Sequence, residues 1–358
     1  MVLFAAILYA RSKNNINVPN YLISIIVATR NEKKNVLECL NALTKQDISI
    51  HQLEIIIVDD DSSDGTFEFL QSFVGNHKIR ILRKNGDSKY KSSKKHALEI
   101  AVSEAKGDIL LFTDADCRPG PFWAMTMLSI FTDSTGMVAG FSPQTAKTKL
   151  WSEVMKIDTA AAAFVAAGTI AFGRGVTCTG RNLAIRKQAL LDVGGYQALP
   201  DSLSGDDDFM LQKISSHPKW QVKYAYDSQA VVPAAGPKNV RCFLDQKRRH
   251  ISAGKHFQIF SQLIFALYHL ANLGIWVSLF IAPFVGAIYI VVFILKLVFD
   301  FIAVFWFLGL FKIRVRIASF ILWQPLFLFY NIFIGPLSFV QKLKWKTGNC
   351  DDASDENE

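Results

Sequence analysis

Residues 53–61, with the sequence LEIIIVDDD, decide the class of fold. The run 53–58 is short, apolar and largely β-branched, which is typical of a strand buried on both faces. Three consecutive carboxylates follow it. A second run of this kind, ILLFT at 109–113, leads directly into Asp114 and Asp116. Buried strands that end in charged side chains are typical of a parallel sheet that binds its ligand at the carboxyl ends of the strands.

Strands and helices alternate on both sides of these two runs. Further apolar strands are predicted at 22–28 and 79–82, and helices at 32–43, 66–73 and 94–105. Strands that alternate with helices predict an α/β fold with a mostly parallel sheet and right-handed crossovers.

The composition divides the chain into a globular part and a membrane part. Of its 358 residues 51% are hydrophobic and 20% charged, which excludes a disordered chain. Residues 257–341 are apolar almost throughout and predict about three membrane segments, near 262–284, 286–310 and 317–340. Lys296 and Asp300, four residues apart in the second segment, predict an intrahelical pair.

The basic residues indicate membrane orientation rather than nucleic-acid binding. The net charge is +8, but no arginine-rich stripe with interleaved aromatic residues is present, so no nucleic-acid partner is expected. Basic residues precede the first predicted span and follow the second, which predicts a multi-pass protein of the cell (inner) membrane with its globular domain in the cytoplasm. These residues are Lys247, Arg248, Arg249, Lys255, Lys312, Arg314 and Arg316.

Four regions are therefore predicted along the chain. Residues 1–20 form a short hydrophobic anchor and linker, and 21–256 form the α/β domain. Residues 257–341 form the membrane domain, and 342–358 form a polar, acidic tail.

Three acidic clusters carry the candidate chemistry. Carboxylates at 59–61 can accept hydrogen bonds from a base or from sugar hydroxyls. Asp114 and Asp116 are hard oxygen ligands of the kind that Mg²⁺ and Mn²⁺ prefer, with substrate phosphates completing the shell. Residues 206–208 place three acids in one helical turn, and their repulsion is expected to raise a carboxylate pKa into the range of a general base.

A basic cluster precedes the first predicted membrane span. Residues 246–250 have the sequence QKRRH, and such a cluster at the membrane surface commonly binds anionic lipid. Gln246 and Arg249 are three residues apart, so they share a helical face and could both reach a diphosphate.

Seven short segments follow one another in a recognisable order between residues 22 and 256. They are 25–32 (IIVATRNE), 58–66 (VDDDSSDGT), 93–98 (SKKHAL), 113–117 (TDADC), 179–186 (TGRNLAIR), 205–207 (GDD) and 246–250 (QKRRH). Together they resemble the family 2 inverting glycosyltransferases with the GT-A fold, in the membrane-bound branch that carries a QxxRW-like motif. Ala28 stands where that family has proline, Ser93 where it has glycine, and His250 where it has tryptophan.

The resemblance implies a role for individual residues. Nucleotide and donor binding falls to Thr29, Glu32, Asp60, Lys94 and Asp114, metal binding to Asp116 with Asp114, general base catalysis to Asp207, and leaving-group stabilisation to Gln246 and Arg249.

The implied reaction is a metal-assisted single displacement from a UDP-sugar, with Mg²⁺ or Mn²⁺ as cofactor. A lipid-linked or other membrane-associated acceptor hydroxyl is favoured, with membrane lipid as a further partner and a homo-oligomer or a partner subunit possible. A processive polysaccharide synthase and a polyprenyl-phosphate sugar transferase are the alternatives. A non-catalytic membrane protein that binds a nucleotide-sugar agrees least with the full set of carboxylates.

Overall fold

The computed structural model describes residues 7–8, 21–49, 51–72, 79–84, 86–335 and 338. Apart from residues 7–8, the predicted anchor and linker at 1–20 lie outside the described residues, as does the predicted tail at 342–358. The chain divides into two compact units. The first comprises Met1–Thr145 and Val165–Ala235, and the second comprises Ala146–Phe164 and Gly236–Glu358.

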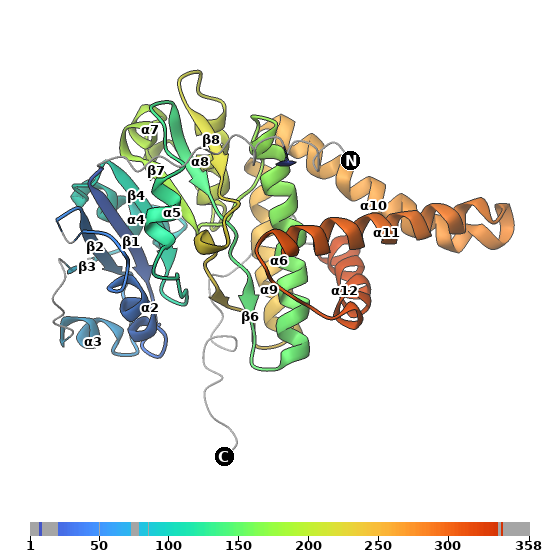
Figure 1. Cartoon of the computed structure of the whole chain (residues 1–358), viewed down its shortest axis with the longest axis horizontal. Coiled ribbons are helices and arrows are strands. Elements are labelled where there is room, and N and C mark those ends of the chain that lie inside the picture. Colours follow the sequence, from blue (N-terminus) through green and yellow to red (C-terminus); the bar gives the residue numbers. More distant parts are fainter. Residues whose placement is uncertain are drawn as a thin grey trace, which may run out of the picture. The chain divides into compact units, whose positions relative to one another are not determined.

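A seven-stranded, mostly parallel sheet forms the first unit, with the order β3-β2-β1-β4-β7-β5-β8 (Figure 1). β7 is antiparallel to both of its neighbours, and the other pairs are parallel. This architecture confirms the predicted α/β fold. The strands are β1 (Ile23–Thr29), β2 (Leu53–Asp59), β3 (Ile79–Arg83), β4 (Ile109–Asp114), β5 (Thr135–Ala139), β7 (Leu183–Arg186) and β8 (Gln221–Tyr224).

Helices and short turns connect these strands. The α-helices of the first unit are α2 (Val36–Leu43), α3 (Thr66–Ser72), α4 (Ser93–Glu104), α5 (Trp123–Leu128), α7 (Lys187–Asp192) and α8 (Asp206–Ser215). The 3₁₀ turns are η1 (Tyr196–Ala198) and η2 (Ser228–Ala230), and β6 (Gln144–Thr145) pairs with β9 (Ala234–Ala235) in a small second sheet.

The pairing of the central strands positions the acidic clusters. β1 pairs in parallel with β2 on one side and with β4 on the other, so that Thr29 lies opposite Asp59 and Ala28 lies opposite Asp114. Because parallel strands end at the same edge of a sheet, the segments that begin at Asp59 and Asp114 leave the sheet at one edge, on either side of the end of β1.

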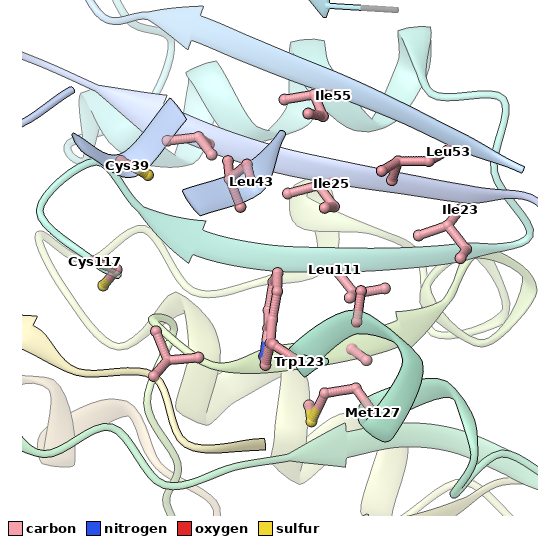
Figure 2. Packing of buried hydrophobic residues seen from close by; sticks show 14 of the residues in the cluster. Ile23, Ile25, Cys39, Leu43, Leu53, Ile55, Leu111, Cys117, Trp123 and Met127 are labelled. Atoms are coloured by element: carbon pink, nitrogen blue, oxygen red, sulfur yellow. The ribbon is translucent and has the colours of Figure 1, made fainter. Parts of the chain in front are cut away.

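A continuous apolar core supports this edge. The side chains of Ile25 and Leu111 lie on the sheet, and Leu43 of α2 and Trp123 of α5 pack over them (Figure 2). All four side chains are buried. The helices are thereby held to the sheet by apolar contacts, which stabilise the fold in proportion to the area removed from water.

The second unit is helical. Four helices of the described chain are long and apolar enough to cross a membrane: Lys149–Ala171, Ile259–Phe284, Ile288–Leu310 and Ile317–Ile334. Three of them fall in the predicted membrane region. The fourth begins the unit and was not predicted as a span, because its alanine-rich stretch is less apolar than the others. The α-helix α6 (Lys149–Ala171) belongs to this unit as far as Phe164. The other helices are α9 (Val240–Ser252), α10 (Ile259–Val285), α11 (Ile288–Leu310) and α12 (Ile317–Phe329), with the 3₁₀ turn η3 (Ala253–His256) and the π-helical turn η4 (Tyr330–Ile334).

α10 and α11 pack against each other along the chain's most apolar stretch (Figure 1). Most of their large apolar side chains are exposed, as a lipid-facing surface requires. Within α11, Lys296 Nζ lies 2.5 Å from Asp300 Oδ2, which confirms the predicted intrahelical pair.

Candidate active site

The loops after β1 and β2 are tied together by side-chain hydrogen bonds. The backbone N–H of Asn31 donates to Ser62 Oγ (2.9 Å), and the N–H of Ser63 donates to Asn31 Oδ1 (2.8 Å). Asp64 Oδ2 accepts from the N–H of Lys33 (3.1 Å). Asn31 has a φ of 55°, a left-handed conformation that asparagine tolerates better than most residues. These contacts hold the carboxyl ends of the two strands in one arrangement.

The first turn of α4 joins all three acidic clusters. Ser92 is the N-cap residue, and its Oγ also donates to Asp206 (3.4 Å). The hydroxyl of Ser93 donates to Asp60. Lys94 Nζ lies 2.5 Å from Asp114 Oδ1. The positive end of the helix dipole stabilises carboxylates placed around it.

Asp60 is buried beside two basic side chains. Its side chain is 3% exposed, and besides Ser93 it faces Lys84 Nζ at 3.5 Å and Arg30 at 3.9 Å. Lys84, which follows β3, is itself buried, and its Nζ donates to the carbonyl of Gly86 (3.0 Å). Sequence reasoning missed Lys84. A lysine at the end of a strand, just before Asn-Gly, was the available signal.

Asp114 and Asp116 form the candidate metal site. Burial, followed by the charges of Asp114 and Glu32, raises the pKa of Asp116 to about 6, and the nearby Arg181 opposes that rise. Lys94 Nζ lies within hydrogen-bond distance of Asp114 Oδ1. Crowded carboxylates of this kind fit a divalent cation, because the ion would relieve their repulsion.

The number of protein ligands agrees with such a site. Among the described residues, no group of three or more histidine, cysteine or acidic side chains is arranged to hold a metal ion. Mg²⁺ in nucleotide enzymes usually binds one or two carboxylates and takes its remaining ligands from phosphates and water. Asp116 and Asp114 would fit this mode of binding.

The acids that begin α8 have separate partners. Asp207 Oδ2 accepts from the backbone N–H of Gly180 (2.6 Å), whereas Asp208 Oδ1 accepts from Thr177 Oγ1 and from the N–H of Cys178, both at 2.9 Å. Asp208 therefore holds the 177–178 segment in place. Within the described residues, Asp206 Oδ1 is buried without a hydrogen-bond partner.

The pKa values of these acids are raised, as predicted, but mainly for a different reason. Burial is the largest cause for all three acids and raises the pKa of Asp206 to about 7. Repulsion by Asp207 is the second cause for Asp206 and Asp208, and Lys94 lowers the pKa of Asp207. Repulsion therefore contributes at Asp206 and Asp208, as expected, but removal of the carboxylates from water contributes more.

Asn182 anchors the segment 179–182 (TGRN), which includes Gly180, to the interior of the first unit. Asn182 is fully buried, donates to the carbonyls of Phe141 and Ala230 (both 2.8 Å), and accepts from Trp123 Nε1 (2.9 Å). A Cβ at Gly140 would lie 2.4 Å from Asn182 Nδ2, so glycine is required there. The asparagine of this motif is structural, and the backbone of Gly180 is the part that reaches Asp207.

The other residues predicted to bind the donor do not contact the start of α4 in any hydrogen bond described above. Thr29 is buried, and its Oγ1 has no hydrogen-bond partner within the described residues. Glu32 accepts from Asn35 Nδ2 (2.8 Å) ahead of α2. Gln246 and Arg249 lie on α9 in the second unit, so their contact with a donor stays a prediction.

Two family models match the chain. That of glycosyl transferase family 2 matches residues 24–193, and that of glycosyl transferase family group 2 matches residues 114–333, more than half of the chain. The two matched ranges together include β1, the acidic clusters and the apolar helices of the second unit.

Curated relatives match over shorter stretches. Glycosyltransferase AglE of Haloferax volcanii is 31% identical over 102 residues, which are 28% of this chain and 32% of AglE. Beta-monoglucosyldiacylglycerol synthase of Trichormus variabilis is 24% identical over 177 residues, which are 49% of this chain and 37% of that protein. The chain thus matches about a third of the length of each relative.

One solved structure resembles nearly the whole chain. Mannosyltransferase PcManGT from Pyrobaculum calidifontis, determined in complex with GDP-Man and Mn²⁺, superposes with a TM-score of 0.56 at 17% identity. The match covers 93% of this chain and 95% of that one. At this identity the similarity concerns the fold.

Proposed function

Because the chain belongs to glycosyl transferase family 2 and has its GT-A fold, we propose that it is a membrane-bound inverting glycosyltransferase. It transfers a sugar from a nucleoside-diphosphate sugar, a UDP-sugar in the first instance, to the hydroxyl of a lipid-linked or membrane-associated acceptor. The observation that best supports this proposal is the start of α4. There Ser92, Ser93 and Lys94 each contact one of the three acidic clusters.

The donor would bind at the edge where β1, β2 and β4 end. Asp60 would accept hydrogen bonds from the nucleoside, and Thr29 and Glu32 would complete the nucleotide site. The buried and unpartnered Thr29 Oγ1, among the described residues, supports this placement. Lys94 would lie beside the diphosphate, and Gln246 and Arg249 would stabilise the leaving group.

The reaction is a single displacement at the anomeric carbon. The acceptor oxygen forms a bond to that carbon while the bond to the diphosphate oxygen breaks, and Asp207 takes the acceptor proton. The N–H of Gly180 holds the Asp207 carboxylate in place, and burial raises its pKa, which makes it a stronger base. A divalent cation held by Asp116 and Asp114 would offset the negative charge of the leaving diphosphate.

The membrane part supports an acceptor at the lipid surface. Four helices of the described chain are apolar enough to span a bilayer, and the name of the relative from Trichormus variabilis describes a lipid product. We propose a multi-pass protein of the cell (inner) membrane whose catalytic domain lies in the cytoplasm, the side favoured by its basic residues.

The test uses membranes that contain the protein and a panel of UDP- and GDP-sugars with lipid extract as acceptor. Release of the nucleoside diphosphate is followed with Mn²⁺ or Mg²⁺ and again with a chelator. We expect release from one donor, lost with the chelator and in Asp116→Ala. Absence of release from every donor would contradict the proposal.

Asp207→Asn tests the general base and the class of acceptor. Its rate should fall by at least about 10²-fold if Asp207 removes a proton from a hydroxyl. Asp208→Asn is the matched control, because asparagine keeps an oxygen that accepts from Thr177 and Cys178. Near-normal turnover of Asp207→Asn would favour a polyprenyl-phosphate acceptor, which needs no strong base. Long polymeric products would instead indicate a processive synthase.

A further inference from the structure

Asp158, on α6, is a buried carboxylate that none of the roles proposed above uses. It is 2% exposed and accepts hydrogen bonds from Trp323 Nε1 (3.2 Å) and Tyr330 Oη (2.9 Å). The ammonium of Lys247 donates to its other oxygen. One carboxylate thus joins α6, α9 and the end of α12 within the second unit.

Lys247 is held in place and does not extend freely to the membrane surface. Its side chain is 17% exposed, and its Nζ lies 5.1 Å from the ring centre of Phe243 and 4.9 Å from that of Tyr330. The Phe243 ring packs edge-on against Trp151 and Tyr330. Aromatic contacts and the Asp158 carboxylate therefore fix the Lys247 side chain together.

The contact between Lys247 and Asp158 also affects Gln246 and Arg249, because all three basic or polar residues lie on α9. Successive residues of an α-helix are rotated by about 100°, so Lys247 points well away from Gln246 and to nearly the opposite side from Arg249. Gln246 and Arg249 are three residues apart and share a face. Fixing Lys247 therefore fixes the direction in which the other two side chains point.

We propose that Asp158 is a positioning residue for the transfer reaction. Its contact with Lys247 sets the rotation of α9 about its axis, and with it the direction of Gln246 and Arg249, the two residues proposed to stabilise the leaving diphosphate. The proposal rests on the diphosphate role proposed for those two residues.

Glu153 provides a matched control on the same helix. It is buried five residues before Asp158 and accepts from Arg316 Nε (2.8 Å) and Ser319 Oγ (2.5 Å) at the start of α12. Its hydrogen bonds within the described residues join α6 to α12 and not to α9. Glu153→Gln therefore disturbs the same kind of buried acidic contact without releasing α9.

The variants are chosen to release Lys247 while keeping the packing. Asp158→Asn retains an oxygen for Trp323 and Tyr330 but loses the charge that holds the ammonium. Lys247→Met retains the apolar stem between Phe243 and Tyr330. Lys247→Arg keeps the positive charge and should retain the nucleotide affinity of the unaltered chain.

The first readout is the affinity of the purified full chain for UDP and for GDP, measured without turnover. Loss of a well-aligned hydrogen bond to a charged diphosphate weakens binding by about 10- to 100-fold, so Asp158→Asn and Lys247→Met should each lower the affinity by about this factor. The double variant should be no weaker than either single variant, because both break one contact. Normal affinity in Asp158→Asn, or an equal loss in Glu153→Gln, would overturn the proposal.

The second readout is independent of nucleotide binding. Amide hydrogen exchange in Val240–Ser252 should be faster in Asp158→Asn than in the unaltered chain and unchanged in Glu153→Gln. If the unaltered chain binds neither nucleotide, the proposed function fails, and exchange still decides whether Asp158 holds α9. Equal exchange in both variants would show that it does not.

Discussion

Asp206→Asn should stabilise the first unit at high pH and leave its stability at low pH nearly unchanged. Burial and the neighbouring Asp207 raise the pKa of Asp206 to about 7 from an ordinary value of 3.8. The unfolded chain therefore releases this proton near pH 4, while the folded chain retains it to about pH 7. Between these values the folded state binds more protons, so Asp206 lowers the free energy of unfolding as pH rises.

The size of the effect follows from that difference in pKa. Each pKa unit corresponds to about 1.36 kcal/mol, so the Asp206 carboxylate costs the folded state at most about 4 kcal/mol above pH 7. This is an upper limit, because side chains and water rearrange around the charge. Asparagine has nearly the same shape and carries no charge, so it removes this cost.

The assay is urea unfolding of the detergent-solubilised chain at pH 5 and pH 8, followed by tryptophan fluorescence. We expect Asp206→Asn to raise the free energy of unfolding about two to three times as much at pH 8 as at pH 5, because the unfolded chain has already released this proton by pH 5. Asp201→Asn serves as the control, because that carboxylate is exposed and should show no such difference. An equal change at both pH values in Asp206→Asn would refute the reasoning.

Three further predictions concern the sheet and the donor site. Asn182→Ala removes the hydrogen bonds that Asn182 makes with the buried Ala230 carbonyl and with Trp123 Nε1. Each unsatisfied buried group costs about 1–3 kcal/mol, so the free energy of unfolding should fall by at least about 2 kcal/mol. A loss below about 1 kcal/mol in urea unfolding would contradict this. Lys94→Met removes the ammonium that lies 2.5 Å from Asp114 and should lower kcat/KM for the donor by about 10²-fold. Lys94→Arg should be less affected. An unchanged kcat/KM in Lys94→Met would show that Lys94 does not act in the donor site. Chelation should abolish nucleotide release, and added Mn²⁺ or Mg²⁺ should restore it, whereas full activity in chelator would exclude the metal role of Asp116.

The sequence was sufficient for the class of fold and for most strands of the first unit. The buried run at 53–58 predicted β2 closely, since a strand covered on both faces must be apolar throughout. The apolar stretch 257–341 likewise predicted α10, α11 and α12, because their length and composition alone suit a bilayer. These features depend on local pattern, which a linear sequence carries in full.

The tertiary structure decided which acids share an environment and why their pKa values shift. Asp60, Asp114 and Asp206 are far apart in sequence, and the first turn of α4 brings them to adjacent hydroxyl and ammonium groups. Burial, the largest cause of the raised pKa of Asp206, depends on the tertiary structure, whereas the repulsion by Asp207 that the sequence indicated is a smaller cause.

The same limit applies to the contacts of the helical unit. The sequence marked Gln246 and Arg249 by their spacing, but nothing local linked Lys247 to Asp158, which lies 89 residues earlier in the chain. Hydrogen bonds and desolvation act over a few ångströms in space, whereas sequence patterns report only neighbours along the chain. The sequence by itself therefore determined the elements and the residue types, and folding alone determined which of those residues act together.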